Sequence, residues 1–363
     1  MKLPRRKSGP GSGFLSSIFA IAVGLAFGFI ILLVSNPSQA ASGMHAILFG
    51  ATFDGMRSVG QILYFATPII LTGLSVGFAF KTGLFNIGTP GQFIVGAYAA
   101  VFVGVRGGSL GGLHWVAALL AALICGALWA LIPGLLKAYA NVNEVIAAIM
   151  MNYIGMYLVN DLVVRTVFDP SRNQSRTVAA TAVIPSMGLD SIFPRSNVNG
   201  GFLIAILAVV VIYIILNKTV FGYELKAVGL NRFASQYAGI NERRSIVASM
   251  LIAGALAGLG GGLLYLAGSG KHIEVVDVLA AEGFQGIPVA LLGMSGPIGV
   301  FFAGLFIAYI SVGGFYMQLH DFVPEVIDII IASIIYFSAF ALIIKNFLDR
   351  RRRSRAVGGK VDA

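Results

Sequence analysis

The stretch VGQILYFATPIILTGLSVGFAF, residues 59–80, decides the class of fold, because its 22 residues include no Asp, Glu, Lys or Arg. An α-helix rises about 1.5 Å per residue, so roughly 20 apolar residues cross the hydrocarbon core of a bilayer, which is about 30 Å thick. The stretch therefore has the length and composition of a membrane-spanning helix.

Similar apolar runs recur along the chain. Of its 363 residues, 57% are hydrophobic and 11% are charged, whereas about 25% are charged in a soluble domain. Breaks between the runs predict ten spans, at about residues 14–34, 59–80, 84–105, 115–136, 144–162, 201–217, 246–267, 283–295, 298–317 and 323–345. The sequence therefore predicts an all-α, polytopic membrane helix bundle. The eighth span is short and contains Gly286 and Pro288, so we expect a broken or re-entrant helix there.

Basic residues orient the spans. With an even number of spans, both the basic N-terminus, residues 1–13, and the basic tail, residues 346–363, lie on one side of the membrane domain, residues 14–345. Segments on that side, together with Lys345 at the end of the last span, then hold 18 of the 25 Lys and Arg residues, as expected of the cytoplasmic side. The net charge of +10 is thus explained by topology in the inner (plasma) membrane, and no nucleic-acid partner is expected.

The first span has a second interpretation. A basic start, an apolar run and the residues 38–40 (SQA) are also typical of a secretory signal with a cleavage site. The run of 21 residues exceeds the usual length of about 7 to 15, so a retained helix is favoured.

Glycine pairs at small-xxx-small spacing predict close helix packing. Four such pairs are Gly24/Gly28, Gly73/Gly77, Gly254/Gly258 and Gly258/Gly262.

Two long loops separate the spans. Residues 163–200 are expected outside, where they are long enough to fold over a pore mouth and offer a docking surface. Residues 218–245 are expected in the cytoplasm. They alternate charged with small and apolar residues, which favours a short helix presented to another protein.

Catalytic motifs are missing from the sequence. The residues GSGK, 268–271, only partly match a phosphate-binding loop, because Tyr265 stands where a glycine is required and His272 where Ser or Thr is required. The four histidines, His45, His114, His272 and His320, lack metal-ligand spacing. We expect no enzyme activity, no bound metal and no cofactor in this chain.

Polar residues inside the spans are the candidates for a solute path, since such groups usually face a bundle interior or a wet cavity. Asp328 lies in the last span and Asn152 in the fifth. Residues 81–92, KTGLFNIGTPGQ, place Asn, Pro and several glycines in a membrane hairpin, which predicts an interrupted helix near a path. A merely structural hairpin turn is the competing interpretation.

The segment FNIGTPGQFIVGAY, residues 85–98, resembles the FNIGxEGQ signature of bacterial ABC importer permeases for nucleosides and simple sugars, with Pro90 in place of the acidic residue. Any role of that carboxylate does not carry over. Further similarity to this family covers roughly residues 60–345 and includes residues 143–146 (NEVI), 151–154 (MNYI), Asn160, 222–240, 286–293 (GIPVALLG) and 297–299 (PIG).

The resemblance implies a type II importer permease of ten helices, closest to the nucleoside branch. Such permeases pair with a second permease, bind separate ATPase subunits that use ATP and Mg, and receive solute from an external lipoprotein or periplasmic binding protein. The similarity also assigns ATPase coupling to Glu224, Gly229, Asn231, Ala234, Tyr237, Ala238, Gly239 and Ile240.

The predicted path is lined by Phe85, Asn86, Gln92, Asn152 and Asp328. A neutral solute suits the few charges in the spans, and the resemblance favours a purine nucleoside. A simple sugar or a branched-chain amino acid is the alternative within the same permease type. An ion-coupled secondary transporter using Asp328 and a structural membrane scaffold are alternatives of other classes.

Overall fold

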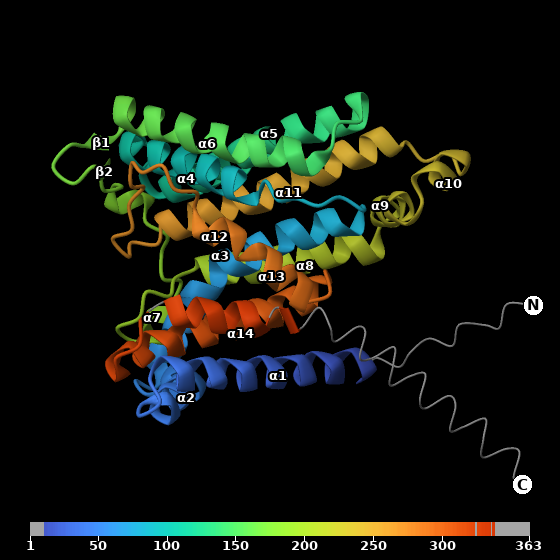
Figure 1. The fold of residues 1–363 in the computed structure, drawn as a ribbon. Helices are drawn as coiled ribbons and strands as arrows, with labels where there is room; N and C mark the ends of the chain where they lie inside the picture. The colour runs from blue at the N-terminus through green and yellow to red at the C-terminus, as the bar shows by residue number, and fades with distance from the viewer. Residues whose placement is uncertain (1–10, 324, 335, 338–363) are drawn as a thin grey trace, which may run out of the picture. The chain divides into compact units, whose positions relative to one another are not determined.

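The computed structural model describes residues 11–323, 325–334, 336 and 337 of the chain, and these are mainly helical (Figure 1). The basic N-terminal residues 1–10 and the tail, residues 346–363, lie outside the described residues, as does part of the predicted tenth span. The orientation inferred from these ends stays a prediction.

The described helices follow one another in this order: α1 (Gly11–Ser35), α2 (Ala40–Phe49), α3 (Met56–Lys81), α4 (Thr89–Arg106), α5 (His114–Ala140), α6 (Glu144–Thr166), α7 (Leu189–Ile192), α8 (Gly201–Lys218), α9 (Val220–Leu230), α10 (Arg232–Tyr237), α11 (Glu242–Tyr265), α12 (Ala281–Phe284), α13 (Gly286–Leu292) and α14 (Pro297–Met317). Short 3-10 helices are η1 (Gly50–Thr52), η2 (Gly108–Leu113), η3 (Ala180–Ala182) and η4 (Gln318–His320), and the strands β1 (Phe168–Asp169) and β2 (Gln174–Ser175) form an antiparallel hairpin. The chain divides into two compact units, residues 51–312 and a smaller unit of residues 1–50 with 313–363.

Helix α11 is the central helix of the larger unit, where it packs on α3, α4 and α5. Glycines make this packing close: a β-carbon on Gly258 would collide with the Ala122 carbonyl of α5, and one on Gly96 of α4 would collide with Gly258 itself. The backbones approach to within contact because these residues have no side chain. The predicted packing role of the glycine pairs in α11 is therefore confirmed.

Six helical segments in the described part of the chain are long and apolar enough to cross a membrane. They are Met56–Lys81, Gly108–Ala140, Glu144–Thr166, Gly201–Lys218, Glu242–Tyr265 and Pro297–His320. The prediction of a helical membrane bundle is confirmed, whereas the count of ten spans is not.

Two predicted spans differ in detail from the observed helices. The third begins at Thr89 rather than at residue 84, because residues 82–88 form a loop after α3. The eighth is broken into the short helices α12 and α13, which meet at Gln285, and this confirms the predicted break.

The smaller unit joins α1 to the helical residues of 325–337. A β-carbon on Gly28 would lie 2.9 Å from Ile330 Cγ2, and one on Gly24 would lie 2.5 Å from Ile334 Cα. This glycine pair is again a helix contact. The sequence did not predict α2, which packs through Gly43 on the ring of Phe322 in the same unit.

Candidate functional site

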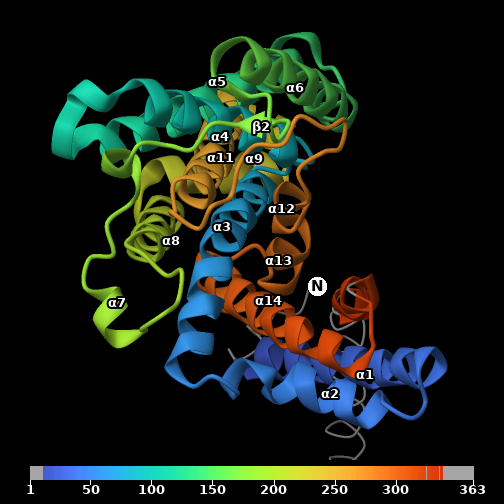
Figure 2. The ribbon, with the colours of Figure 1, turned by 90° about the vertical axis from the view of Figure 1, so that its left-hand side faces the viewer.

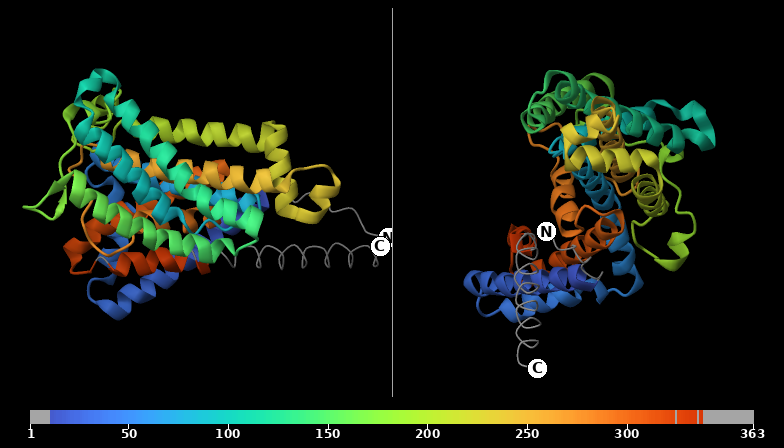
Figure 3. Two further views of the ribbon diagram at one scale, coloured as in Figure 1. Left: turned by 90° about the horizontal axis from the view of Figure 1, so that it is seen from above. Right: turned by 90° about the vertical axis from the view of Figure 1, so that its right-hand side faces the viewer.

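The two ends of the larger unit carry different features. Helices α9 and α10 project beyond the ends of α5 and α11, as the views from the front and from above both show (Figures 1 and 3). The β1–β2 hairpin and α7 lie at the opposite end, which faces the viewer in Figure 2. The predicted site residues other than Asp328 belong to this unit and occur near the first end and between the two ends.

The segment predicted to be cytoplasmic, residues 218–245, folds into α9 and α10 as two capped helices. Thr219 Oγ1 accepts from the Gly222 amide at 3.1 Å, and Asn231 Oδ1 accepts from the Ala234 amide at 3.0 Å. Each bond satisfies one of the free amides at a helix N-terminus. The predicted helical character of the segment is confirmed.

The predicted coupling residues are mostly accessible. Half-buried are Glu224 and Ile240, and exposed are Gly229, Asn231, Ala234, Tyr237, Ala238 and Gly239. Tyr237 is 95% exposed, and two apolar residues that the sequence analysis did not single out, Leu230 and Phe233, are 88% and 74% exposed. Leu230 and Phe233 are apolar residues in an otherwise charged segment, and this pattern could have identified them as candidates for a docking surface. The tip formed by α9 and α10 thus presents apolar side chains that no described residue covers.

An ion pair anchors this tip. Arg232 of α10 pairs with Glu242 at the start of α11, with Nη2 donating to Oε1 at 2.9 Å, and Arg232 Nη1 donates to Asn141 Oδ1 at 3.2 Å beyond α5. Because Glu242 accepts its hydrogen bonds, the pKa of the Arg232 guanidinium is raised above its ordinary value. The tip is therefore tied to α11 and to the end of α5.

Helix α9 also touches the loop that follows α3. A β-carbon on Gly229 would lie 2.5 Å from the Lys81 carbonyl oxygen and 2.8 Å from the Gly83 amide. Thr82 Oγ1 and Ser249 Oγ of α11 are hydrogen-bonded at 2.7 Å. A displacement of α9 would consequently press on the loop formed by residues 82–88.

This loop is held by buried amides that the sequence analysis assigned to the solute path. The Asn86 and Gln92 side chains exchange two hydrogen bonds of 2.9 Å, and Asn86 Nδ2 also donates to Ser75 Oγ at 3.1 Å. All three side chains are buried.

Asn152 of α6 extends the network. Its Oδ1 accepts from the Gly91 amide at 2.9 Å and its Nδ2 donates to the Ile87 carbonyl at 3.0 Å. We call Asn86, Gln92 and Asn152 the amide network. Its polar groups are occupied by protein partners in this conformation, so the network fixes the loop against α4 and α6.

The other two predicted path residues do not join the amide network. Phe85 is half-buried and stacks on Phe80 with ring centroids 5.3 Å apart. Asp328 is exposed and belongs to the smaller unit. Pro90, where the resemblance expects an acidic residue, is buried against Gly283 of α12.

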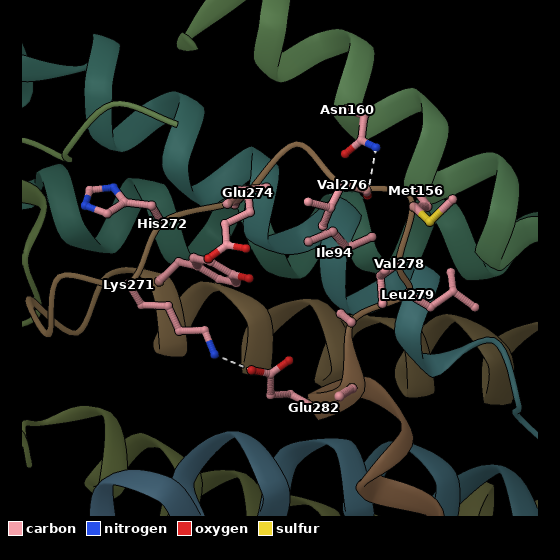
Figure 4. Close-up of a pocket in the computed structure, with 14 residues that line it drawn as sticks. Ile94, Met156, Asn160, Lys271, His272, Glu274, Val276, Val278, Leu279 and Glu282 are labelled. Carbon is pink, nitrogen blue, oxygen red and sulfur yellow. Dashed lines mark hydrogen bonds and ion pairs between the residues drawn. The ribbon is translucent and has the colours of Figure 1, made fainter. Parts of the chain in front are cut away.

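Two adjoining hollows lie at the end of α11 away from the tip. The outer hollow, with a volume of about 270 Å³, is formed by α4, α6, the end of α11 and residues 271–282. Its neighbour, of about 380 Å³, shares Lys271, Ala281 and Glu282 with it. Figure 4 shows Lys271 and Glu282 pointing toward each other as an ion pair, whereas His272 points away.

The sequence analysis missed the outer hollow, although it noted Lys271 and His272 in another connection. Residues 271–282 join its wall to the predicted external loop: the Ser175 amide donates to the Ile273 carbonyl at 2.8 Å, and the Val275 amide donates to the Asn173 carbonyl at 3.1 Å. The β1–β2 hairpin, which lies within residues 163–200, therefore packs along the segment that lines the hollow.

Apolar helices of spanning length, an uncovered helical tip at one end and solute-sized hollows at the other define the class of protein: a helical membrane permease. The chain belongs to the family described as branched-chain amino acid transport system / permease component, whose model matches residues 58–339. Members of this family are components of transport systems.

Relatives are similar over nearly the whole chain. The guanosine ABC transporter permease protein NupP of Bacillus subtilis (strain 168) is 41% identical over 95% of this chain and 98% of its own length. The nucleoside ABC transporter permease protein NupB of Lactococcus lactis subsp. cremoris is 35% identical over 94% and 95%, respectively. The glucose ABC transporter permease protein TsgB13 of Haloferax volcanii is 33% identical over 96% and 92%. No solved structure matches the chain.

Proposed function

We propose that this chain is the permease subunit of an ATP-binding cassette importer that carries a nucleoside, with purine nucleosides preferred, across the inner membrane. The observation that supports this best is the 41% identity to a guanosine permease over 95% of the chain. The described part of the chain is compatible with a neutral solute, with buried amides in the loop after α3 and on α4 and α6.

The proposed topology has ten spans. The six segments of spanning length are joined by α1, α4, the broken pair α12–α13 and the helix that begins near residue 325. Both chain ends and the α9–α10 tip then face the cytoplasm, and the β1–β2 hairpin faces outside.

The proposed partners follow from this orientation. A separate ATPase, which uses ATP and Mg, binds the exposed tip, and an external binding lipoprotein delivers solute at the opposite end. A second, distinct permease completes the pore, and pairs of similar permeases in one species, NupP with NupQ and NupB with NupC, support that arrangement.

The proposed mechanism uses the contacts of the tip. When the ATPase subunits close, they displace α9 and α10 together, because the two helices are joined directly at Asn231. The Arg232–Glu242 pair passes the displacement to α11. The contact between Gly229 and residues 81–83 passes that displacement to the loop carrying Asn86. The start of α4 moves with the loop and changes access to the solute path.

Uptake of radiolabelled guanosine, adenosine, ribose and leucine tests the proposal in cells with and without the gene, with ATP depletion as the control. We expect deletion to abolish ATP-dependent nucleoside uptake alone. Loss of sugar uptake instead would favour the second candidate, a sugar permease. The 33% identity to a glucose permease supports that candidate. Uptake driven only by an ion gradient, and lost in Asp328→Asn, would overturn the ATP-driven assignment.

A variant of the tip tests the coupling role. Ala238→Trp places a bulky side chain on the exposed turn after α10 and is expected to abolish transport while membrane insertion and expression stay normal. Ala41→Trp, at an exposed alanine of α2, is the matched control. Normal ATP-dependent uptake by Ala238→Trp would refute the docking role of this turn.

A further inference from the structure

The outer hollow has the make-up of a small-molecule site. Ligand sites are typically apolar clefts of roughly 300–1,000 Å³ with a few polar groups that orient the ligand. The neighbour, at about 380 Å³, is within this range, and the outer hollow, at about 270 Å³, lies just below it and adjoins the neighbour. Apolar walls come from Ile94 of α4, Met156 of α6, and Val276 and Leu279 of the loop.

Tyr265, the last residue of α11, is a buried polar side chain without a hydrogen-bond partner among the described residues. It is only 8% exposed and lines the hollow, and its hydroxyl makes no hydrogen bond to any described residue. Every fully enclosed side-chain oxygen or nitrogen of the described residues has a hydrogen-bond partner. The Tyr265 hydroxyl is therefore accessible, which leaves it able to bond a ligand. By contrast, Tyr64 nearby is bonded to Ser269 at 2.8 Å.

A second group that lines the same hollow is Glu274, an exposed residue of the loop formed by residues 271–282. The Glu274 carboxylate has no ion-pair or hydrogen-bond partner among the described residues, and it comes within electrostatic reach of Tyr265, as does Glu282. Figure 4 shows Glu274 between His272 on one side and Val276 of the same loop and Ile94 of α4 on the other. A free carboxylate accepts hydrogen bonds only, so it selects a ligand that donates them.

The charges of the hollow disfavour an anionic ligand. Its one lysine, Lys271, is neutralised by Glu282, while Glu274 adds a negative charge. A neutral ligand with a flat ring can pack against the apolar walls, and two neighbouring hydroxyl groups on it can donate hydrogen bonds to the Glu274 carboxylate.

We propose that the outer hollow is a nucleoside-binding site, in which the base lies against the walls formed by Ile94, Met156 and Val276 and the two vicinal hydroxyls of the ribose donate to Glu274. The Tyr265 hydroxyl bonds a polar edge of the same ligand. This inference rests on the proposed function and assigns a place and a chemistry to the solute. The hollow is connected to the hairpin of residues 81–92, because α12, which lines the hollow through Ala281 and Glu282, packs through Gly283 on Pro90.

Binding of guanosine and 2′,3′-dideoxyguanosine to the purified, assembled importer tests the site, with ligand-induced thermal stabilisation as the readout. Glu274→Gln is expected to weaken guanosine binding about tenfold, because a hydrogen bond to a charged acceptor is lost, and to leave the dideoxy compound unaffected. Tyr265→Phe removes one oxygen that has no hydrogen-bond partner among the described residues, so it should weaken both ligands without destabilising the free complex.

Two control variants make the same chemical changes outside the hollow. Asp190→Asn removes an exposed carboxylate of α7, and Tyr213→Phe removes an exposed hydroxyl of α8; both should bind guanosine as the unaltered protein does. Unchanged guanosine binding in Glu274→Gln and Tyr265→Phe, or an equal loss of both ligands in Glu274→Gln, would overturn the inference. If deletion of the gene left nucleoside uptake intact, the proposed function itself would be refuted. If uptake depended on the gene but these variants bound guanosine normally, only the assignment of the binding site would be refuted.

Discussion

Replacing Asn86 by leucine is the most informative perturbation of the amide network. Leucine has a similar size, but it cannot replace the three hydrogen bonds that join Asn86 to Gln92 and Ser75. The change leaves the oxygen and the nitrogen of the Gln92 amide without partners, and Gln92 is only 1% exposed. The Ser75 hydroxyl also loses its donor, but it lies inside α3, where it can turn to a backbone carbonyl of the preceding helical turn.

The magnitude follows from these two atoms. A buried polar group that loses its partner destabilises a protein by about 1–3 kcal/mol. Two such groups, with partial relaxation of the loop, reduce the free energy of unfolding by about 3 kcal/mol. Adding Gln92→Met removes the unpaired amide as well. The double variant should therefore regain most of the lost stability, since exchanging both partners for apolar groups is nearly neutral.

The one cysteine of the sequence provides the assay. Cys125 is half-buried in α5, so its reaction with a fluorogenic maleimide during heating in detergent reports helix unfolding. We expect Asn86→Leu to unfold at a lower temperature than both the unaltered protein and the double variant. If the single and double variants unfold alike, the two amides do not depend on each other and the reasoning is refuted. A double variant that is stable but does not transport would show that the amides also contact the solute.

Three further predictions concern contacts between helices. Gly229→Val should abolish transport yet leave the ATPase bound in co-purification, because the new side chain would displace α9 from residues 81–83; normal transport would contradict the proposed route of coupling. Gly258→Leu should lower the yield of monodisperse protein, since overpacking costs about 1–3 kcal/mol or more, and an unchanged yield would mean that α5 and α11 are not in close contact. Arg232→Met should lower the free energy of unfolding by about 1.5–3 kcal/mol. The charge-reversed pair Arg232→Glu with Glu242→Arg should restore part of this loss in the same cysteine assay, and equal instability of the two variants would argue against the ion pair.

The predicted path residues show how far single positions can be interpreted from sequence. Asn86, Gln92 and Asn152 were selected because polar groups inside spans rarely face lipid, and the structure places all three in one buried network. Their spacing along the chain gave no sign that Asn86 and Gln92 satisfy each other. Asp328 was selected by the same rule but lies exposed in the other unit, because the rule concerns polarity and depth and contains no information on neighbours.

The glycine pairs and the tip were more accessible to sequence analysis. Close packing requires small residues at helical spacing, and this is a local pattern, so Gly254 and Gly258 could be assigned before their partner on α5 was known. Similarly, the alternation of charged and apolar residues indicated a helix in residues 218–245. The sequence did not show that Leu230 and Phe233 form the exposed surface of this segment, because their exposure depends on how α9 and α10 are oriented relative to α8 and α11.

The sequence by itself determined the solvent and the class of fold, because insertion into lipid depends on the summed hydropathy of contiguous residues and on a fixed rise per residue. Only the tertiary structure decided which polar groups are paired and where the solute-sized hollows lie. The outer hollow draws on residues as distant as Ile94, Met156 and Tyr265 together with 271–282. Hydrogen bonds and cavities depend on distances of a few ångströms between segments remote in the chain, and these distances are set by the packing of α11 against its neighbours.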